Sequence, residues 1–135
     1  MKAYIVAYLC TAVAFVCVDA IWLTQAAALL YQPELGEMLL PKFNLVPAIL
    51  FYLMYMVGIV VFAVAPALDS QTWTTATWRG ALFGLIAYAT YDLTNQATLR
   101  NWSTRVTIAD LIWGTFLTGA AATAGYLMTR RLARR

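Results

Sequence analysis

The chain has 135 residues, of which 63% are apolar and 11% are charged, whereas a soluble domain has about 45 to 50% apolar and about 25% charged residues. Nine Lys and Arg against six Asp and Glu give a net charge of +3, which is too little for a nucleic-acid-binding surface. There is no His and there are two Cys, so common zinc and haem sites lack their ligands and we expect no metal and no cofactor. These properties predict one small integral membrane domain over residues 1–135.

The hydrophobic pattern predicts four membrane-spanning helices. A helix that crosses a hydrocarbon layer of about 30 Å needs about 20 mostly apolar residues. Segments of this kind cover residues 4–30, 45–65, 78–99 and 107–128. The segments between them, residues 32–44, 66–77 and 101–106, are rich in loop-forming residues and are predicted loops. Because short loops join antiparallel neighbours, we expect an all-α, up-down bundle of four transmembrane helices.

The basic residues predict the orientation of this bundle, because Lys and Arg in short loops remain in the cytoplasm. A cytoplasmic amino terminus places six basic residues on the cytoplasmic side, namely Lys2, Arg79, Arg130, Arg131, Arg134 and Arg135. It leaves three on the other side, namely Lys42, Arg100 and Arg105. We therefore expect both termini in the cytoplasm, Trp73 and Trp78 at the inner interface, and Trp102 and Trp22 at the outer interface.

The first span has a second interpretation. Lys2, the apolar run after it and Ala26–Ala28 loosely resemble a secretion signal with a small-residue cleavage site, although the run is longer than a usual signal core. Cys10 and Cys17 are seven residues apart on one helix, so their Cα atoms are about 10 Å apart, too far for a disulfide. We interpret both cysteines as packing residues.

Small residues predict where the helices pack closely. Gly80 and Gly84 have a G-x-x-x-G spacing on the third span, and the fourth span carries a ridge of small residues formed by Gly114, Thr118, Ala121, Ala122 and Gly125. Packing within the bundle is the favoured interpretation of these surfaces, and a homodimer seam is the alternative. The second span is bulky on all sides over residues 50–56, which favours a lipid-facing helix.

Three acidic residues fall inside the predicted spans, namely Asp19, Asp92 and Asp110. An ionisable residue within a membrane helix costs a few kcal/mol, so each of them requires a partner, a cavity or a task. Asp19 and Asp92 lie about 21 to 24 Å from the cytoplasmic face at a rise of 1.5 Å per residue. Asp110 lies near the start of the descending fourth span, at nearly the same level. We expect three helices to bring carboxylates to one depth in the outer half of the membrane.

Polar neighbours extend this pattern. On the third helix, Tyr88, Asp92, Asn95 and Gln96 share one face through their spacing of three and four residues. The available counter-ions on the same side of the membrane are Lys42, Arg100 and Arg105. Three acids and three bases would make a neutral cluster.

Each acid also has a structural interpretation. Asp110 together with Thr107 fits a helix capping pattern. Asp92 and Asn95 suit a hydrogen-bond network that holds the bundle together. Asp19 has no cap to make, which favours a functional role. The remaining acids are predicted to be solvated loop residues, namely Glu34, Glu37 and Asp69.

A short motif occurs in both the first and the fourth span. Residues 19–22 read Asp-Ala-Ile-Trp and residues 110–113 read Asp-Leu-Ile-Trp. Trp22 and Trp113 therefore lie one turn from Asp19 and Asp110. An aromatic wall beside a carboxylate suits a cationic or amphipathic ligand.

Three strings of residues carry a family resemblance. They are Asp-Ala-Ile-Trp-Leu at 19–23, Tyr-Asp-Leu-Thr-Asn at 91–95 and Asp-Leu-Ile-Trp-Gly at 110–114. With four spans over the whole chain, the sequence resembles the bacterial membrane proteins known as domain of unknown function 2177. The resemblance implies a bacterial inner-membrane location, four helices and no established activity. It also implies a lipid-related role, because genes of this family often neighbour those of lipid-modifying enzymes.

The leading functional hypothesis is binding or transport of a small amphipathic molecule or lipid in an outer-half polar pocket. Its predicted ligand-binding residues are Asp19, Trp22, Tyr88, Asp92, Asn95, Asp110 and Trp113. Membrane lipids are the expected partners, and transport by so few helices favours a homodimer. One alternative is a lipid-modifying enzyme with an Asp pair as general acid and base, for which no nucleophile beside a base is present. Another is a non-catalytic subunit of a larger membrane complex, docked through the ridge of small residues.

Overall fold

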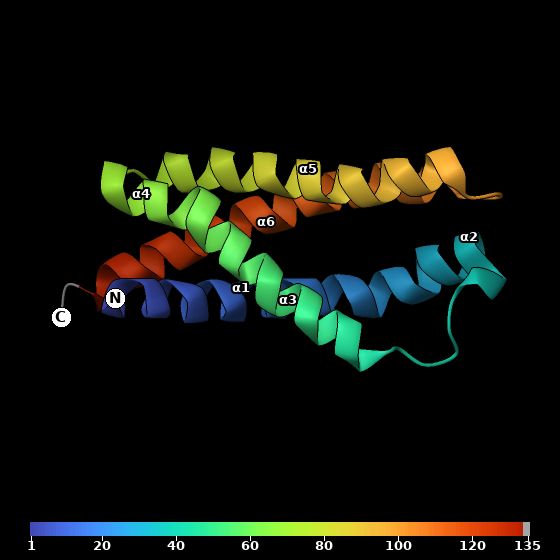
Figure 1. Ribbon diagram of the computed structural model, residues 1–135, viewed down its shortest axis with the longest axis horizontal. Helices are drawn as coiled ribbons and strands as arrows, with labels where there is room; N and C mark the ends of the chain where they lie inside the picture. The colour runs from blue at the N-terminus through green and yellow to red at the C-terminus, as the bar shows by residue number, and fades with distance from the viewer. Residues whose placement is uncertain (134–135) are drawn as a thin grey trace.

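The computed structural model describes residues 1–133, in which four helical spans run roughly antiparallel along one axis (Figure 1). Span 1 joins α1 (Lys2–Ala26), η1 (Ala27–Tyr31), α2 (Gln32–Leu35) and η2 (Gly36–Met38). Span 2 joins α3 (Leu45–Ile59), η3 (Val60–Val64) and α4 (Ala65–Ser70), span 3 is α5 (Trp73–Thr98) and span 4 is α6 (Thr104–Leu132). The amino terminus and the end of α6 lie together at one end of the bundle, and α2 lies at the opposite end, which we call the α2 end. Arg134 and Arg135 lie outside the described residues.

Two of the three predicted loops are shorter than expected, because helix continues through their prolines. The predicted loop 32–44 is helical as far as Met38, and the predicted loop 66–77 is reduced to two residues between Ser70 and Trp73. Pro33 and Pro66 each follow a π-helical turn, η1 and η3. Proline lacks a backbone N–H, and the wider turn before it shifts the hydrogen-bond register so that the helix continues. The loop prediction was therefore wrong for most of these residues.

The dimensions of the spans suit a membrane. Spans 1, 2 and 4 are long and apolar enough to cross one. The 26 residues of α5 are about 39 Å long, but polar residues in its second half make it less apolar. α5 still runs the length of the bundle, because it connects α4 at one end of the bundle to the start of α6 at the other end (Figure 1). The predicted all-α, antiparallel four-helix architecture is confirmed.

α6 packs against both α5 and α1 through its small residues. A Cβ atom added at Gly80 or Gly84 would clash with backbone and side-chain atoms of α6, including Thr118. A Cβ added at Gly125 would clash with Thr11 of α1. These glycines allow backbones to approach closely, which stabilises helix pairs in lipid. The predicted small-residue seams thus lie inside this bundle, and Gly114 and Thr118 are buried.

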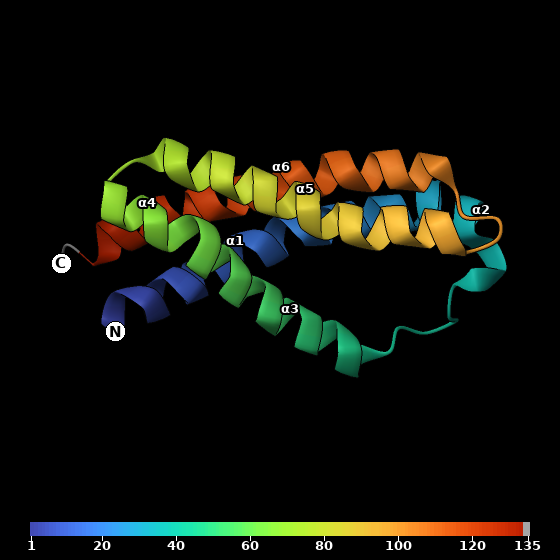
Figure 2. The same ribbon diagram turned by 45° about the horizontal axis from the view of Figure 1, so that its top comes forward.

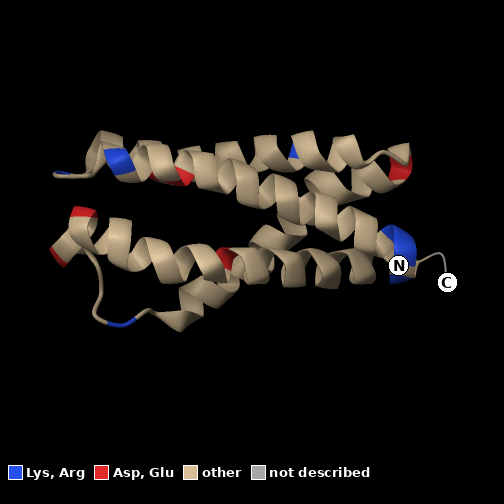
Figure 3. Ribbon diagram, turned by 180° about the vertical axis from the view of Figure 1, so that it is seen from behind, with Lys and Arg blue, Asp and Glu red and all other residues tan. Residues whose placement is uncertain are grey.

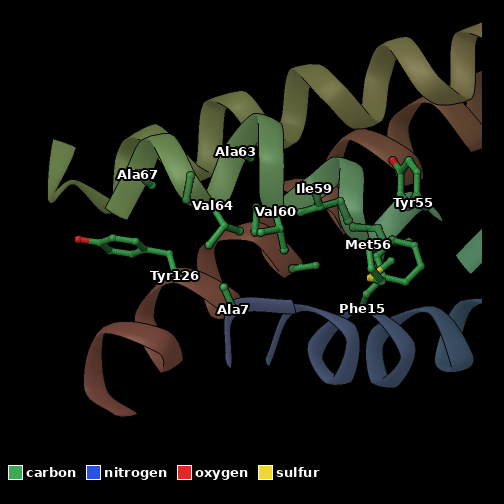
Figure 4. Packing of buried hydrophobic residues seen from close by; sticks show 14 residues of the cluster. Ala7, Phe15, Tyr55, Met56, Ile59, Val60, Ala63, Val64, Ala67 and Tyr126 are labelled. Atoms are coloured by element: carbon green, nitrogen blue, oxygen red, sulfur yellow. The ribbon is translucent and has the colours of Figure 1, made fainter. Parts of the chain in front are cut away.

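Span 2 differs in its two halves. Its first half diverges from the other helices (Figure 2), and Leu45, Ile49 and Leu50 are exposed. Its second half packs into the hydrophobic core between α1, α5 and α6 (Figure 4), where the buried residues include Tyr55, Met56, Ile59, Val60, Ala63 and Val64. The prediction of a lipid-facing helix is therefore wrong for the second half, because bulky side chains there fill the space beside the small residues of α6. Cys10 is buried and Cys17 is exposed, so the prediction that both cysteines are packing residues is wrong for Cys17.

Candidate functional site

The repeated Asp-x-Ile-Trp motif forms a reciprocal pair across α1 and α6. Trp22 and Trp113 stack with their ring centroids 4.6 Å apart and their planes 9° apart. Trp113 Nε1 donates a hydrogen bond to Asp19 Oδ1 at 3.3 Å. Trp22 Nε1 donates to the Tyr31 hydroxyl at 3.0 Å, and Tyr31 donates to Asp110 Oδ1 at 2.5 Å. Because the two helices are antiparallel, each Asp lies at the level of the Trp from the other motif.

Trp22 has partners within the bundle that the sequence did not predict. Its ring is half-buried against α6, and its Nε1 donates to a part-buried polar network. The stacking partner comes from a segment that is distant in sequence. The aromatic wall expected beside the carboxylates is thus a pair of stacked indoles.

Asp19 is buried, with 5% of its surface exposed, and two donors stabilise its carboxylate. Besides Trp113, the hydroxyl of Tyr52 on α3 donates to Asp19 Oδ2 at 2.6 Å. Tyr52 was not predicted as a site residue, because in the sequence it is one of several bulky residues of span 2. An aromatic residue with a polar tip in an apolar helix is the signal that could have identified it.

Asp110 does not cap α6, so its predicted capping role is wrong. The helix begins at Thr104, and the Ser103 side chain accepts a hydrogen bond from the Val106 N–H as its N-cap. Asp110 therefore lies in the second turn of α6, is 5% exposed and accepts its hydrogen bond from Tyr31. Sequence reading also missed Tyr31, because it stood at the predicted edge of the first span rather than within a longer helix.

Asp92 is the most isolated of the three acids. Its side chain is 0% exposed, and neither carboxylate oxygen has a hydrogen-bond partner among the described residues. The carboxyl group of Asp110 is close enough to share a proton with it in a hydrogen bond, and Asp92 lines none of the cavities described below. Tyr88 lies half-buried one turn away against Gly114, while Asn95 is half-buried and forms no hydrogen bond with the three acids. Of the predicted polar stripe, Asp92 and Tyr88 therefore lie in this region, whereas Asn95 makes no hydrogen bond with its acids.

No basic residue neutralises these acids within residues 1–133. The single ion pair of this part of the chain joins Arg105 to Glu34 at 2.8 Å, and the Ser103 hydroxyl also donates to Glu34 at 2.6 Å. On the ribbon, most basic residues lie near the ends of the bundle, whereas acidic residues also occur along its length (Figure 3). The predicted neutral cluster is therefore wrong, since Arg105 is used elsewhere. The prediction that Glu34 is a solvated loop residue is also wrong, because Glu34 lies on α2 and its contacts with Ser103 and Arg105 join α2 to the start of α6.

Three cavities adjoin two of the acids, Asp19 and Asp110. The large cavity, of about 640 Å³, lies at the α2 end between span 1, the 39–44 loop and α6, and its walls include Tyr31, Tyr91 and Asp110. The aromatic cavity, of about 350 Å³, is lined by Phe51, Ala87, Tyr88, Tyr91 and Asp110. The two cavities share Tyr91 and Asp110 as wall residues, so both lie against this carboxylate. A third cavity, of about 340 Å³, lies between α1 and α3, with Asp19 and Tyr52 in its wall.

Apolar helices of membrane-spanning length, arranged antiparallel around buried carboxylates, define an α-helical multi-pass membrane protein. The chain belongs to the family described as "Predicted membrane protein (DUF2177)", which matches residues 4–127. The family resemblance inferred from the three sequence strings is thereby confirmed. Comparison with curated proteins and with solved structures gives no match.

Proposed function

We propose that this protein binds a small amphipathic molecule or a lipid headgroup at the α2 end, as a binding protein or as the binding step of a carrier. The observation that carries the proposal is the buried carboxylate of Asp92, which no donor among residues 1–133 satisfies, next to Asp110, which lines both the large and the aromatic cavity. An ionisable group without a partner inside a membrane helix is a strong indication of function, because its burial is costly.

The cavities support this proposal by their size and by their walls. Sites for small molecules have volumes of about 300 to 1,000 Å³, with mostly apolar walls and a few polar groups, and the large cavity of about 640 Å³ falls in this range. Its apolar lining includes Leu23, Leu35, Leu39 and Phe43. Such walls suit an apolar tail, while Tyr31 and Asp110 suit a polar head.

Filling the large cavity should expel the bound molecule. Ala27 lines this cavity, whereas the adjacent Ala28 is exposed and is not part of its wall. We expect Ala27→Phe to lower retention of a co-purified amphipathic molecule by about tenfold or more. Native mass spectrometry of protein released from lipid nanodiscs measures the retained fraction.

Ala28→Phe is the matched control and should retain the molecule as the unsubstituted protein does. Equal retention by both variants would contradict the proposal, and so would the absence of any retained molecule from the unsubstituted protein. Helical content and elution volume of both variants show whether they are folded.

We also propose that the protein lies in the bacterial inner membrane, with both termini in the cytoplasm. More basic residues lie at the end of the bundle that holds the amino terminus and the end of α6, which we call the terminal end, than at the α2 end, and this excess supports the orientation. In a variant whose own Cys10 and Cys17 are replaced by Ser, Lys42→Cys at the α2 end should react with a membrane-impermeant maleimide on intact cells. Ser70→Cys at the terminal end should react only after lysis, and the reverse pattern would overturn the orientation.

A further inference from the structure

Asp110, which lines both the large and the aromatic cavity, and the buried Asp92 next to it form no ion pair with a basic residue among residues 1–133. Asp19 accepts hydrogen bonds from Tyr52 and Trp113, and Asp110 accepts one from Tyr31, but Asp92 accepts none within the described chain. The single ion pair found in residues 1–133 involves none of them. Buried charges require a partner of opposite charge or a full set of donors. A ligand with a positive charge would supply what Asp92 and Asp110 lack.

The shape of the site favours an organic cation over a metal ion. Among residues 1–133, no three His, Cys, Asp or Glu side chains converge closely enough to hold a metal. The aromatic cavity instead places the rings of Phe51, Tyr88 and Tyr91 around one carboxylate, that of Asp110. Aromatic faces attract substituted ammonium groups, and rings grouped around such a cation are a frequent way to bind it.

The large cavity accounts for the rest of such a ligand. It shares the wall residues Tyr91 and Asp110 with the aromatic cavity, and its other wall residues include the apolar Leu39, Leu40 and Phe43. A molecule with its charged head at Asp110 could therefore lay an alkyl tail along these walls. An anionic head would meet the carboxylate of Asp110 and no base at this position.

We infer that the ligand of this site is an amphipathic organic cation. Its substituted ammonium head lies against Asp110 in the aromatic cavity, beside Phe51, Tyr88 and Tyr91, and its alkyl tail lies in the large cavity. This inference rests on the proposed function and specifies its ligand class. The ammonium group belongs either to a free alkylamine or to the headgroup of a membrane lipid.

Binding of tritiated dodecyltrimethylammonium to the full chain in nanodiscs of phosphatidylglycerol tests the inference. We expect one saturable site per protein. Asp110→Asn should weaken it by about tenfold or more, because it removes the acidic group in the cavity wall, and Asp92→Asn should also weaken it, because it removes the acidic group next to Asp110. Asp69→Asn is the matched control, since it makes the same substitution at an exposed acid and should leave binding unchanged. The helical content of Asp110→Asn and of Asp92→Asn shows whether each variant is folded. If one of them does not fold, the other still tests the inference.

Competition by amphiphiles with the same dodecyl tail separates this inference from the proposed function. Dodecyl sulfate and a neutral dodecyl polyethylene glycol ether should compete poorly. If the neutral ether competes as well as the cation, the inference is overturned while the proposed function stands. If no saturable binding of the cation occurs, the inference is also overturned, and retention in Ala27→Phe still decides the proposed function separately.

The composition of the nanodisc distinguishes the two sources of the ammonium group. If the headgroup of a membrane lipid is the source, adding phosphatidylethanolamine should weaken apparent binding of the tritiated probe by competition. If a free alkylamine is the source, phosphatidylethanolamine should have no effect on the probe. Both results support the ligand class, provided that the Asp variants weaken binding.

Discussion

Replacing Asp92 by Asn should stabilise the folded bundle by about 1 to 3 kcal/mol. The carboxylate is 0% exposed, has no hydrogen-bond partner within residues 1–133 and lies beside the carboxylate of Asp110. An amide of the same shape removes the repulsion between two negative groups and supplies an N–H donor that can reach Asp110. The free energy of unfolding, measured by titration of the protein from mild detergent into dodecyl sulfate, checks this expectation.

Asp69→Asn provides the comparison for this measurement. Asp69 is exposed near the end of α4, so its substitution should change the free energy of unfolding by less than about 0.5 kcal/mol. A destabilised Asp92→Asn protein would show that the carboxylate has a structural role. Stabilisation together with weaker ligand binding would show instead that the buried acid is kept for function at the expense of stability.

Replacing Gly84 by Leu should destabilise the bundle by about 3 kcal/mol, because it separates α5 from α6. A Cβ atom at this position would already clash with the Gly114 carbonyl oxygen and the Thr118 side chain. The helices must move apart to make room, and this movement would also disturb Tyr88, which packs on Gly114. Unfolding in dodecyl sulfate measures the loss.

Ala97→Leu is the control for this substitution. It adds a Leu side chain to an exposed position of the same helix, where lipid accommodates it at little cost. Equal stability of the two variants would contradict the close approach of α5 and α6. If Gly84→Leu unfolds completely in mild detergent, its loss of helical content relative to Ala97→Leu shows the same effect.

The recurrence of a four-residue motif illustrates how sequence and structure contribute to the site. The Asp and Trp residues of both copies could be identified from the sequence as unusual in membrane helices. Their pairing could not, because it depends on α1 and α6 being antiparallel neighbours at one register. That register is set by the close packing of Gly125 on Thr11, which involves residues far apart in the chain.

Interactions between distant segments also explain the errors in the sequence reading. The sequence predicts Arg105 on the same side of the membrane as the three acids. It pairs with Glu34 instead, because span 1 extends to Met38 and places α2 beside the start of α6. Tyr31 reaches Asp110 for the same reason. Prolines that indicate loops in most sequences here follow π-helical turns, and the spacing of apolar residues does not reveal such turns.

By itself, the sequence determined that this is a membrane protein with four antiparallel helices, because the length of apolar runs and the scarcity of charge leave few other solutions. It also determined that Asp19, Asp92 and Asp110 are the unusual groups, because ionisable residues in lipid require an explanation. Only the tertiary structure decided which groups meet them. Hydrogen bonds and cavities depend on helix register and on the divergence of α3, and these follow from side-chain packing across helices rather than from the pattern along any one of them.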